Sequence, residues 1–190
     1  MQLATLRVAA DPSNATEDDR AALRAAGQLL GDGAPGLSCA DRIAAGEIRP
    51  RVHRVLVEKG ARRMTLWVAG YAVREYRVAL GREPVGDKRV AGDGRTPEGH
   101  YTIDGRNPGS EFHRSLHISY PNAADVRSAR EAGASPGGEI MIHGLPNAAD
   151  WVEREHTRFD WTEGCIAVTN EEIDEIWELV ADGTPIEIRP

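Results

Sequence analysis

Short apolar runs separated by glycine and proline follow one another from residue 51 to the end of the chain. The runs are rich in valine and isoleucine, which favour pleated, half-buried strands. With 20 glycines and 11 prolines among 190 residues, regular structure is interrupted too often for a helical bundle. The sequence therefore predicts a mainly β domain. The predicted strands are 52–57, 64–68, 71–80, 100–103, 115–118, 139–142, 165–168 and 185–188.

One late helix is predicted beside these strands. Thr169 and Glu172 have the spacing of a capping box, in which each side chain bonds the backbone N–H of the other residue. Ile173, Ile176 and Val180 then follow one helical face. We therefore expect an amphipathic helix to begin just after Thr169.

Residues 1–50 differ from the rest of the chain. They are rich in alanine, aspartate and glycine, and they show two short helical patterns without strand alternation. The sequence thus predicts a short helical N-terminal extension, 1–50, followed by the β domain, 51–190. Because a weakly amphipathic pair of helices cannot form a core alone, we expect the extension to dock on the β domain through residues such as Leu29 and Ile43.

Charge and hydropathy limit the classes of partner. The chain has 23 basic and 30 acidic residues, a net charge of −7, which argues against a generally cationic nucleic-acid binder. No apolar run approaches the roughly 18 residues that span a bilayer, so no membrane span is predicted. The stretch from Met1 to Ala10 lacks the basic start and long apolar run of a secretory signal. Two locations stay open: the cytoplasm or, if a leader was removed, the periplasm or cell-wall side.

Two reactive side chains stand at the ends of predicted strands. His143 ends one apolar run, and Cys165, preceded by Gly164, begins another. A thiol benefits from a neighbouring imidazole, because an unassisted cysteine has a pKa of about 8.5 and is mostly protonated at neutral pH. Glycine before a nucleophile lets a substrate carbonyl approach backbone N–H groups that stabilise an oxyanion. The spacing alone leaves a second interpretation open, a small buried cysteine and a hydrogen-bonded turn histidine.

A metal site is not expected. His113 and His117 have a spacing that would bring two ligands together on a helix, but in a strand four residues span about 13 Å. Neither cysteine lies in a Cys-x-x-Cys pair, so neither a metal nor another cofactor is predicted. Cys39 lies in the N-terminal extension, and we expect no disulfide between it and Cys165.

Three motifs occur in order along the β domain. They are Gly92–Tyr101 with Thr96-Pro97 at its centre, Ser115–Asn122, and His143-Gly144 followed by Thr162-Glu163-Gly164-Cys165-Ile166 and Asn170. Together they resemble the L,D-transpeptidase catalytic domain, or YkuD, in its Gram-negative murein-associated branch. The resemblance spans 51–190 and implies an L,D-transpeptidase-like β-sandwich of mixed sheets with one late α-helix.

The resemblance implies cysteine-dependent acyl transfer on peptidoglycan stem peptides, in cell-wall biogenesis and cell shape. Cys165 would attack the carbonyl of meso-diaminopimelate and release D-alanine, with His143 as base and then acid. The acceptor stays open. An amine would give a cross-link or attach a lipoprotein lysine. Water would make the domain an L,D-carboxypeptidase or amidase, and attack on an existing bond would release a murein-linked lipoprotein.

The sequence also predicts residues that orient the reacting groups or bind the substrate. As oxyanion or orienting groups we predict Gly144, Gly164, Thr162 and His117. The chain departs from the family pattern at Glu163, where many members have histidine, and at Ala167, where many have an arginine suited to a substrate carboxylate. Substrate-binding candidates are Trp161, Arg158 and Arg154 in the 145–161 segment, which is either a lid over the site or a surface loop.

Overall fold

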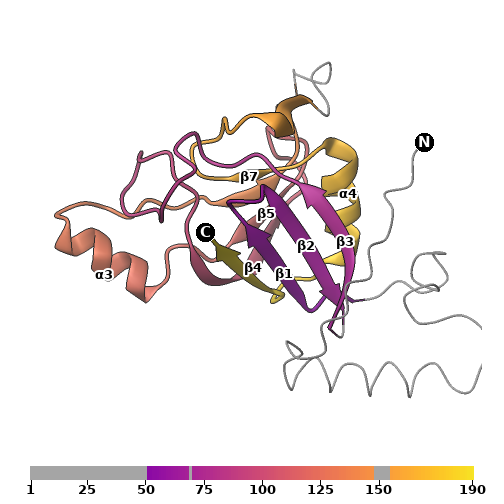
Figure 1. The fold of residues 1–190 in the computed structure, drawn as a ribbon, viewed down its shortest axis with the longest axis horizontal. Coiled ribbons are helices and arrows are strands. Elements are labelled where there is room, and N and C mark those ends of the chain that lie inside the picture. Colours follow the sequence, from indigo (N-terminus) through magenta and orange to yellow (C-terminus); the bar gives the residue numbers. More distant parts are fainter. Residues whose placement is uncertain (1–50, 69, 148–154) are drawn as a thin grey trace, which may run out of the picture.

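The computed structural model describes residues 51–68, 70–147 and 155–190 (Figure 1). The predicted helical extension, its docking and Cys39 lie outside these described residues. Within the described ranges, eight strands form one sheet in the order β3-β2-β1-β8-β4-β5-β6-β7, which confirms the mainly β prediction. The strands are β1 (Arg54–Glu58), β2 (Arg63–Val68), β3 (Tyr71–Arg77), β4 (Gly99–Asn107), β5 (Ser115–Ile118), β6 (Met141–His143), β7 (Ile166–Ala167) and β8 (Pro185–Arg189).

The sheet is mixed and curled. β1 pairs with β8 in parallel and β6 pairs with β7 in parallel, whereas the other neighbours are antiparallel. The first half of β4 pairs with β8 and its second half with β5, with a register shift between Ile103 and Gly105. Because such a bulge bends a strand and increases its twist, β4 carries the chain from one half of the sheet to the other. The predicted mixed sheets are thus two halves of one continuous curled sheet.

The core lies inside the curl and beneath a helix. Strands β5 to β7 are buried on both faces, and Leu116, Ile142 and Ile166 are fully buried. Helix α4 (Asn170–Leu179) begins at the predicted capping box, and it buries Ile173 and Ile176 completely. The predicted late helix is confirmed, because both the cap and the apolar face are encoded within a few residues of sequence.

Helix α3 (Ala123–Glu131) was not predicted, so the expectation of a single helix in this domain was wrong. It buries only Asp125 and Ala129, and therefore has no apolar stripe to detect. Its stability comes from its N-terminus, where Asn122 and Asp125 form a capping box. Figure 1 shows α3 at one side of the sheet and α4 at the other. In the described ranges, no helix is long and apolar enough to cross a membrane.

The connection between β3 and β4 is held by a buried lysine. Lys59 Nζ donates to the carbonyl oxygens of Gly86 (2.6 Å) and Thr96 (2.9 Å) and to Glu98 Oε1 (2.8 Å). The Thr96 hydroxyl accepts a bond from the N–H of Gly81 at 2.9 Å. These contacts give the Thr-Pro motif a structural role, because they fix the loop that lies against the turn preceding Cys165.

Candidate active site

Strands β6 and β7 bring His143 and Cys165 onto one face of the sheet. In this parallel pair Ile142 lies beside Ile166 and His143 lies beside Ala167. Cys165 precedes Ala167 by two residues, and side chains two apart in an extended chain face the same side. Cys165 and His143 therefore share a face although 22 positions separate them in the sequence.

The His143 imidazole is neutral, with its hydrogen on Nδ1. Its Nδ1 lies 2.7 Å from the carbonyl oxygen of Gly144, and a carbonyl can only accept, so Nδ1 carries the hydrogen. Nε2 is then left with a lone pair that can take a proton. The side chain is 4% exposed. Burial lowers the pKa of His143 to about 4, against the opposing effect of the bond to Gly144.

The Cys165 thiol is also neutral at rest. Among the described residues it is a free cysteine, and its Sγ donates to the carbonyl oxygen of Glu139 at 3.4 Å. Burial raises the pKa of the thiol and the Glu139 carboxylate adds to this effect, whereas a backbone hydrogen bond from Met141 and the Lys88 ammonium oppose it. The resting pair is therefore a thiol and an imidazole rather than a thiolate and an imidazolium. A thiol in this state can act as a nucleophile only if its proton leaves sulfur as the new bond forms.

Thr162 and Gly164 shape the turn before the cysteine. The Thr162 hydroxyl donates to the carbonyl oxygen of Cys165 (2.7 Å) and accepts from the Gly164 N–H (3.1 Å). Gly164 has a φ of +134°, and a Cβ there would lie 2.6 Å from the Arg95 carbonyl oxygen. Only glycine fits this turn, and its N–H already has a partner, so these contacts favour an orienting role over oxyanion binding for both residues.

Gly144 and Asn170 shape the turn after the histidine. The Gly144 N–H donates to the carbonyl oxygen of Phe112 at 3.1 Å. A Cβ on Gly144 would lie 2.5 Å from Asn170 Oδ1, which accepts from the Leu145 N–H at 2.8 Å. Asn170 thus holds the His-Gly turn in place. Asn170 was absent from the predicted site residues, although it belongs to the motif that carries the family resemblance.

Aromatic rings surround the His143 imidazole. Phe112 packs against it with ring centroids 4.6 Å apart, and Trp161 meets it edge-on at 5.8 Å. His156 meets Trp161 edge-on at 6.1 Å. The predicted Trp161 therefore lies beside the base, whereas Phe112 and His156 were not among the predicted site residues. Nothing in the sequence points to Phe112 as a site residue. The only indication for His156 is that it belongs to the aromatic 145–161 segment.

The remaining predicted residues are His117, Arg158 and Arg154. His117 lies on the same face of the sheet as Ser115 and His143, opposite Met141 in the β5–β6 register, and its Nδ1 pairs with Asp104. Arg158 forms an ion pair of 3.0 Å with Glu155, and both side chains are more than 60% exposed (64% and 61%). Arg154 falls within 148–154, outside the described residues. No group of three His, Cys, Asp or Glu side chains in the described ranges is arranged to hold a metal ion.

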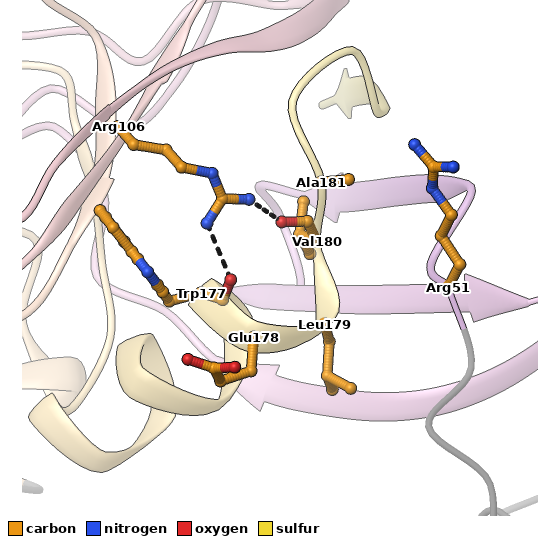
Figure 2. A pocket seen from close by; sticks show the side chains of 7 residues that line it. All are labelled: Arg51, Arg106, Trp177, Glu178, Leu179, Val180 and Ala181. Atoms are coloured by element: carbon orange, nitrogen blue, oxygen red, sulfur yellow. Dashed lines mark hydrogen bonds between the residues drawn. The ribbon is translucent and has the colours of Figure 1, made fainter.

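A surface depression of about 410 Å³ has a lining that shares no residue with the Cys165–His143 site. Figure 2 shows the side chains that line it. The Arg106 guanidinium donates to the Trp177 carbonyl oxygen at 2.8 Å and to the Val180 carbonyl oxygen. It thereby satisfies carbonyls at the end of α4, so we assign it a structural role. The depression is lined by Arg51, Arg106, Trp177, Glu178, Leu179, Val180 and Ala181.

Comparison with known proteins identifies the family. The family model of the L,D-transpeptidase catalytic domain, YkuD, matches residues 52–188, so the chain belongs to this family and carries an enzyme domain of that type. The "Putative L,D-transpeptidase YafK" of Escherichia coli (strain K12) is 33% identical over 108 residues, which cover 55% of this chain and 36% of that protein. The predicted family is thereby confirmed.

A solved structure shows the same fold. The helical cell shape determining protein Pgp2 from Campylobacter jejuni superposes with a TM-score of 0.55 at 27% sequence identity. The match covers 73% of this chain and 48% of the Pgp2 chain. The chain therefore spans about a third of YafK and about half of Pgp2, so the similarity concerns the catalytic domain rather than the whole of either relative.

Proposed function

We propose that this domain catalyses cysteine-dependent acyl transfer on peptidoglycan stem peptides as an L,D-transpeptidase. The observation that carries the proposal is the register of β6 and β7, which puts the Cys165 and His143 side chains on the same face of the sheet. The Gly144 contact supports it, because it leaves Nε2 of His143 unprotonated.

In the first half of the reaction, Cys165 Sγ attacks the carbonyl carbon of meso-diaminopimelate while its proton passes to His143 Nε2. The tetrahedral intermediate collapses and the carbon–nitrogen bond to D-alanine breaks. The departing amine takes the proton from the His143 imidazolium. The product is a thioester on Cys165 and free D-alanine, and the burial that lowers the pKa of His143 favours this return of the proton.

In the second half, an acceptor attacks the thioester, gives its proton to His143, and the thiolate leaves and recovers the proton. A stem-peptide amine as acceptor forms a cross-link, and a lipoprotein lysine attaches that protein to the wall. Water as acceptor makes the same Cys165–His143 pair a carboxypeptidase or amidase. Because peptidoglycan lies outside the cytoplasmic membrane, the proposal places the reaction in the periplasm, in wall biogenesis and cell shape.

The test is incubation with purified disaccharide tetrapeptides followed by mass analysis. We expect loss of D-alanine, a thioester adduct on the intact protein, and a cross-linked dimer. A tripeptide product without a dimer would assign water as the acceptor. Alkylation of Cys165 first shows that the thiol of the wild-type protein is free to react. If such protein leaves the tetrapeptide unchanged, the proposal is contradicted.

A further inference from the structure

Buried polar atoms without a hydrogen-bond partner are unevenly distributed in the described part of the chain. Four of the six belong to Ser115, His156 and Trp161: one hydroxyl oxygen, both imidazole nitrogens and the indole nitrogen. The other two are Arg54 Nε and Trp67 Nε1, which lie together because the Arg54 guanidinium stacks over the Trp67 ring at 4.9 Å. Leaving buried polar atoms unpaired is costly, so a cluster of them calls for an explanation.

The three residues of the cluster adjoin His143 or the ring that packs against it. Ser115 stands directly opposite His143 in the β5–β6 register, so their side chains share a face, and it is 1% exposed. Trp161 meets His143 edge-on, with 5.8 Å between ring centroids. His156, which is 6% exposed, meets the Trp161 ring edge-on, with 6.1 Å between ring centroids. We call Ser115, His156 and Trp161 the donor cluster.

The chemistry of the donor cluster fits an anion. A hydroxyl, an indole N–H and the one N–H of a neutral imidazole supply three donors. A carboxylate accepts at two oxygens and can take all three. Ala167 stands where many family members have an arginine. The arginines of the surrounding segments already have partners: Arg62 pairs with Asp160, Arg77 with the Thr157 carbonyl, Arg82 with Glu163 and Arg158 with Glu155.

The D-alanine leaving group carries a carboxylate that would lie beside His143. In a stem tetrapeptide the terminal D-alanine carries its carboxylate on the carbon next to the amide nitrogen. His143 must lie within hydrogen-bond reach of that nitrogen to protonate it. The carboxylate is therefore held beside the His143 imidazole whenever the donor peptide is bound productively.

We propose that the donor cluster binds the C-terminal carboxylate of the acyl-donor tetrapeptide and so orients the scissile bond between Cys165 and His143. This inference rests on the proposed function and extends it to the group that is recognised. The polar atoms of the cluster are closed to water in the free chain. Entry of the peptide must therefore move the side chains that cover these atoms, while Ser115, His156 and Trp161 stay beside His143.

The test compares two ligands that differ only at the carboxylate. The variant Cys165→Ala binds without turnover and is titrated by calorimetry with the stem tetrapeptide and with its C-terminal amide. We expect the carboxylate form to bind at least about tenfold more tightly. In the same background, Ser115→Ala removes one donor with almost no change in volume, and Trp161→Phe removes the indole N–H together with part of the ring. Either should bring the ratio of the two affinities towards one.

Trp67→Phe is the matched control, because Trp67 also has an unpaired buried indole nitrogen but lies on β2, away from His143. It should leave the ratio unchanged. Equal affinities for the acid and the amide, or a ratio that survives both donor substitutions, would overturn the inference. Release of D-alanine by the wild-type protein is measured separately. Catalysis with equal affinities refutes only the donor cluster, and selective binding without catalysis refutes only the proposed reaction.

Discussion

Two buried polar groups in this domain have opposite surroundings. Lys59, 2% exposed, has three acceptors within the chain, including the carbonyl of Thr96 and the carboxylate of Glu98. His143, 4% exposed, has a satisfied Nδ1, but its neighbours carry four buried polar atoms without partners in the described residues. The buried ammonium of Lys59 is paired internally, whereas the unpaired buried polar atoms of the described residues lie mostly around His143, where we propose that a carboxylate binds.

The largest expected effect is on the chemical step itself. Cys165→Ser should lower the rate of D-alanine release at least about a thousandfold, because a serine hydroxyl has a far higher pKa than a thiol. The melting temperature should stay within about 2 °C, since the two side chains have nearly the same volume. A serine variant with turnover close to that of the wild type would remove Cys165 from the nucleophile role.

Replacing the base should have the next largest effect. His143→Gln should reduce the rate about 10²- to 10⁴-fold, the usual contribution of a general base. Because His143 titrates near pH 4 in the folded chain, the acid limb of the wild-type profile of kcat/KM should also lie near pH 4. Initial rates between pH 3.5 and 8 test this, and an acid limb near pH 6.5 would argue against His143 as the group that titrates.

The same shift in pKa has a consequence for stability. The unfolded chain takes up a proton at His143 below about pH 6.5, whereas the folded chain does so only near pH 4. The free energy of unfolding should therefore fall as the pH drops through this window. His143→Gln should remove that part of the pH dependence in urea titrations, and an unchanged slope would indicate that other groups cause it.

On the structural side of the comparison, Lys59→Met should destabilise the fold by about 3 kcal/mol. It leaves the Glu98 carboxylate and two carbonyls without their cation. The double variant Lys59→Met with Glu98→Gln should recover part of the loss, because it removes the unpaired charge. Urea denaturation of the single and double variants measures both, and a loss below about 0.5 kcal/mol in the single variant would show that the lysine does not hold the loop.

The donor cluster should respond differently to the same kind of truncation. Ser115→Ala removes a buried hydroxyl that has no partner in the described residues, so the free energy of unfolding should change by less than about 1 kcal/mol or rise. Urea denaturation under the conditions used for Lys59→Met gives a direct comparison. A loss as large as that of the lysine variant would mean that Ser115 is a structural residue.

The smallest effect is expected at the exposed pair of Arg158 and Glu155. Arg158→Ala should change stability by less than about 0.5 kcal/mol, because solvent screens such pairs. If Arg158 binds substrate, as the sequence suggests, the variant should instead raise KM while leaving stability unchanged. Steady-state kinetics with the tetrapeptide separate the two outcomes.

Much of the fold was predictable because its signals are local. The strands follow from short runs of β-branched residues between breakers, and α4 follows from the Thr169–Glu172 cap and the apolar face behind it. Helix α3 was missed because a cap at Asn122, rather than an apolar stripe, stabilises it. The strand ends and the family motifs also predict Cys165 and His143 as the reacting pair, and their shared face agrees with this prediction.

What the sequence determined by itself is therefore the mainly β class, the late helix, the family, and the two residues of the proposed reaction. Only the tertiary structure decided that His143 is a neutral base with its hydrogen on Nδ1, that the N–H groups of Gly144 and Gly164 already have partners, and that unpaired donors gather beside the base. The reason is physical. Caps and periodicity depend on residues a few positions apart, whereas desolvation and hydrogen-bond pairing depend on what distant strands and loops bring together around a side chain.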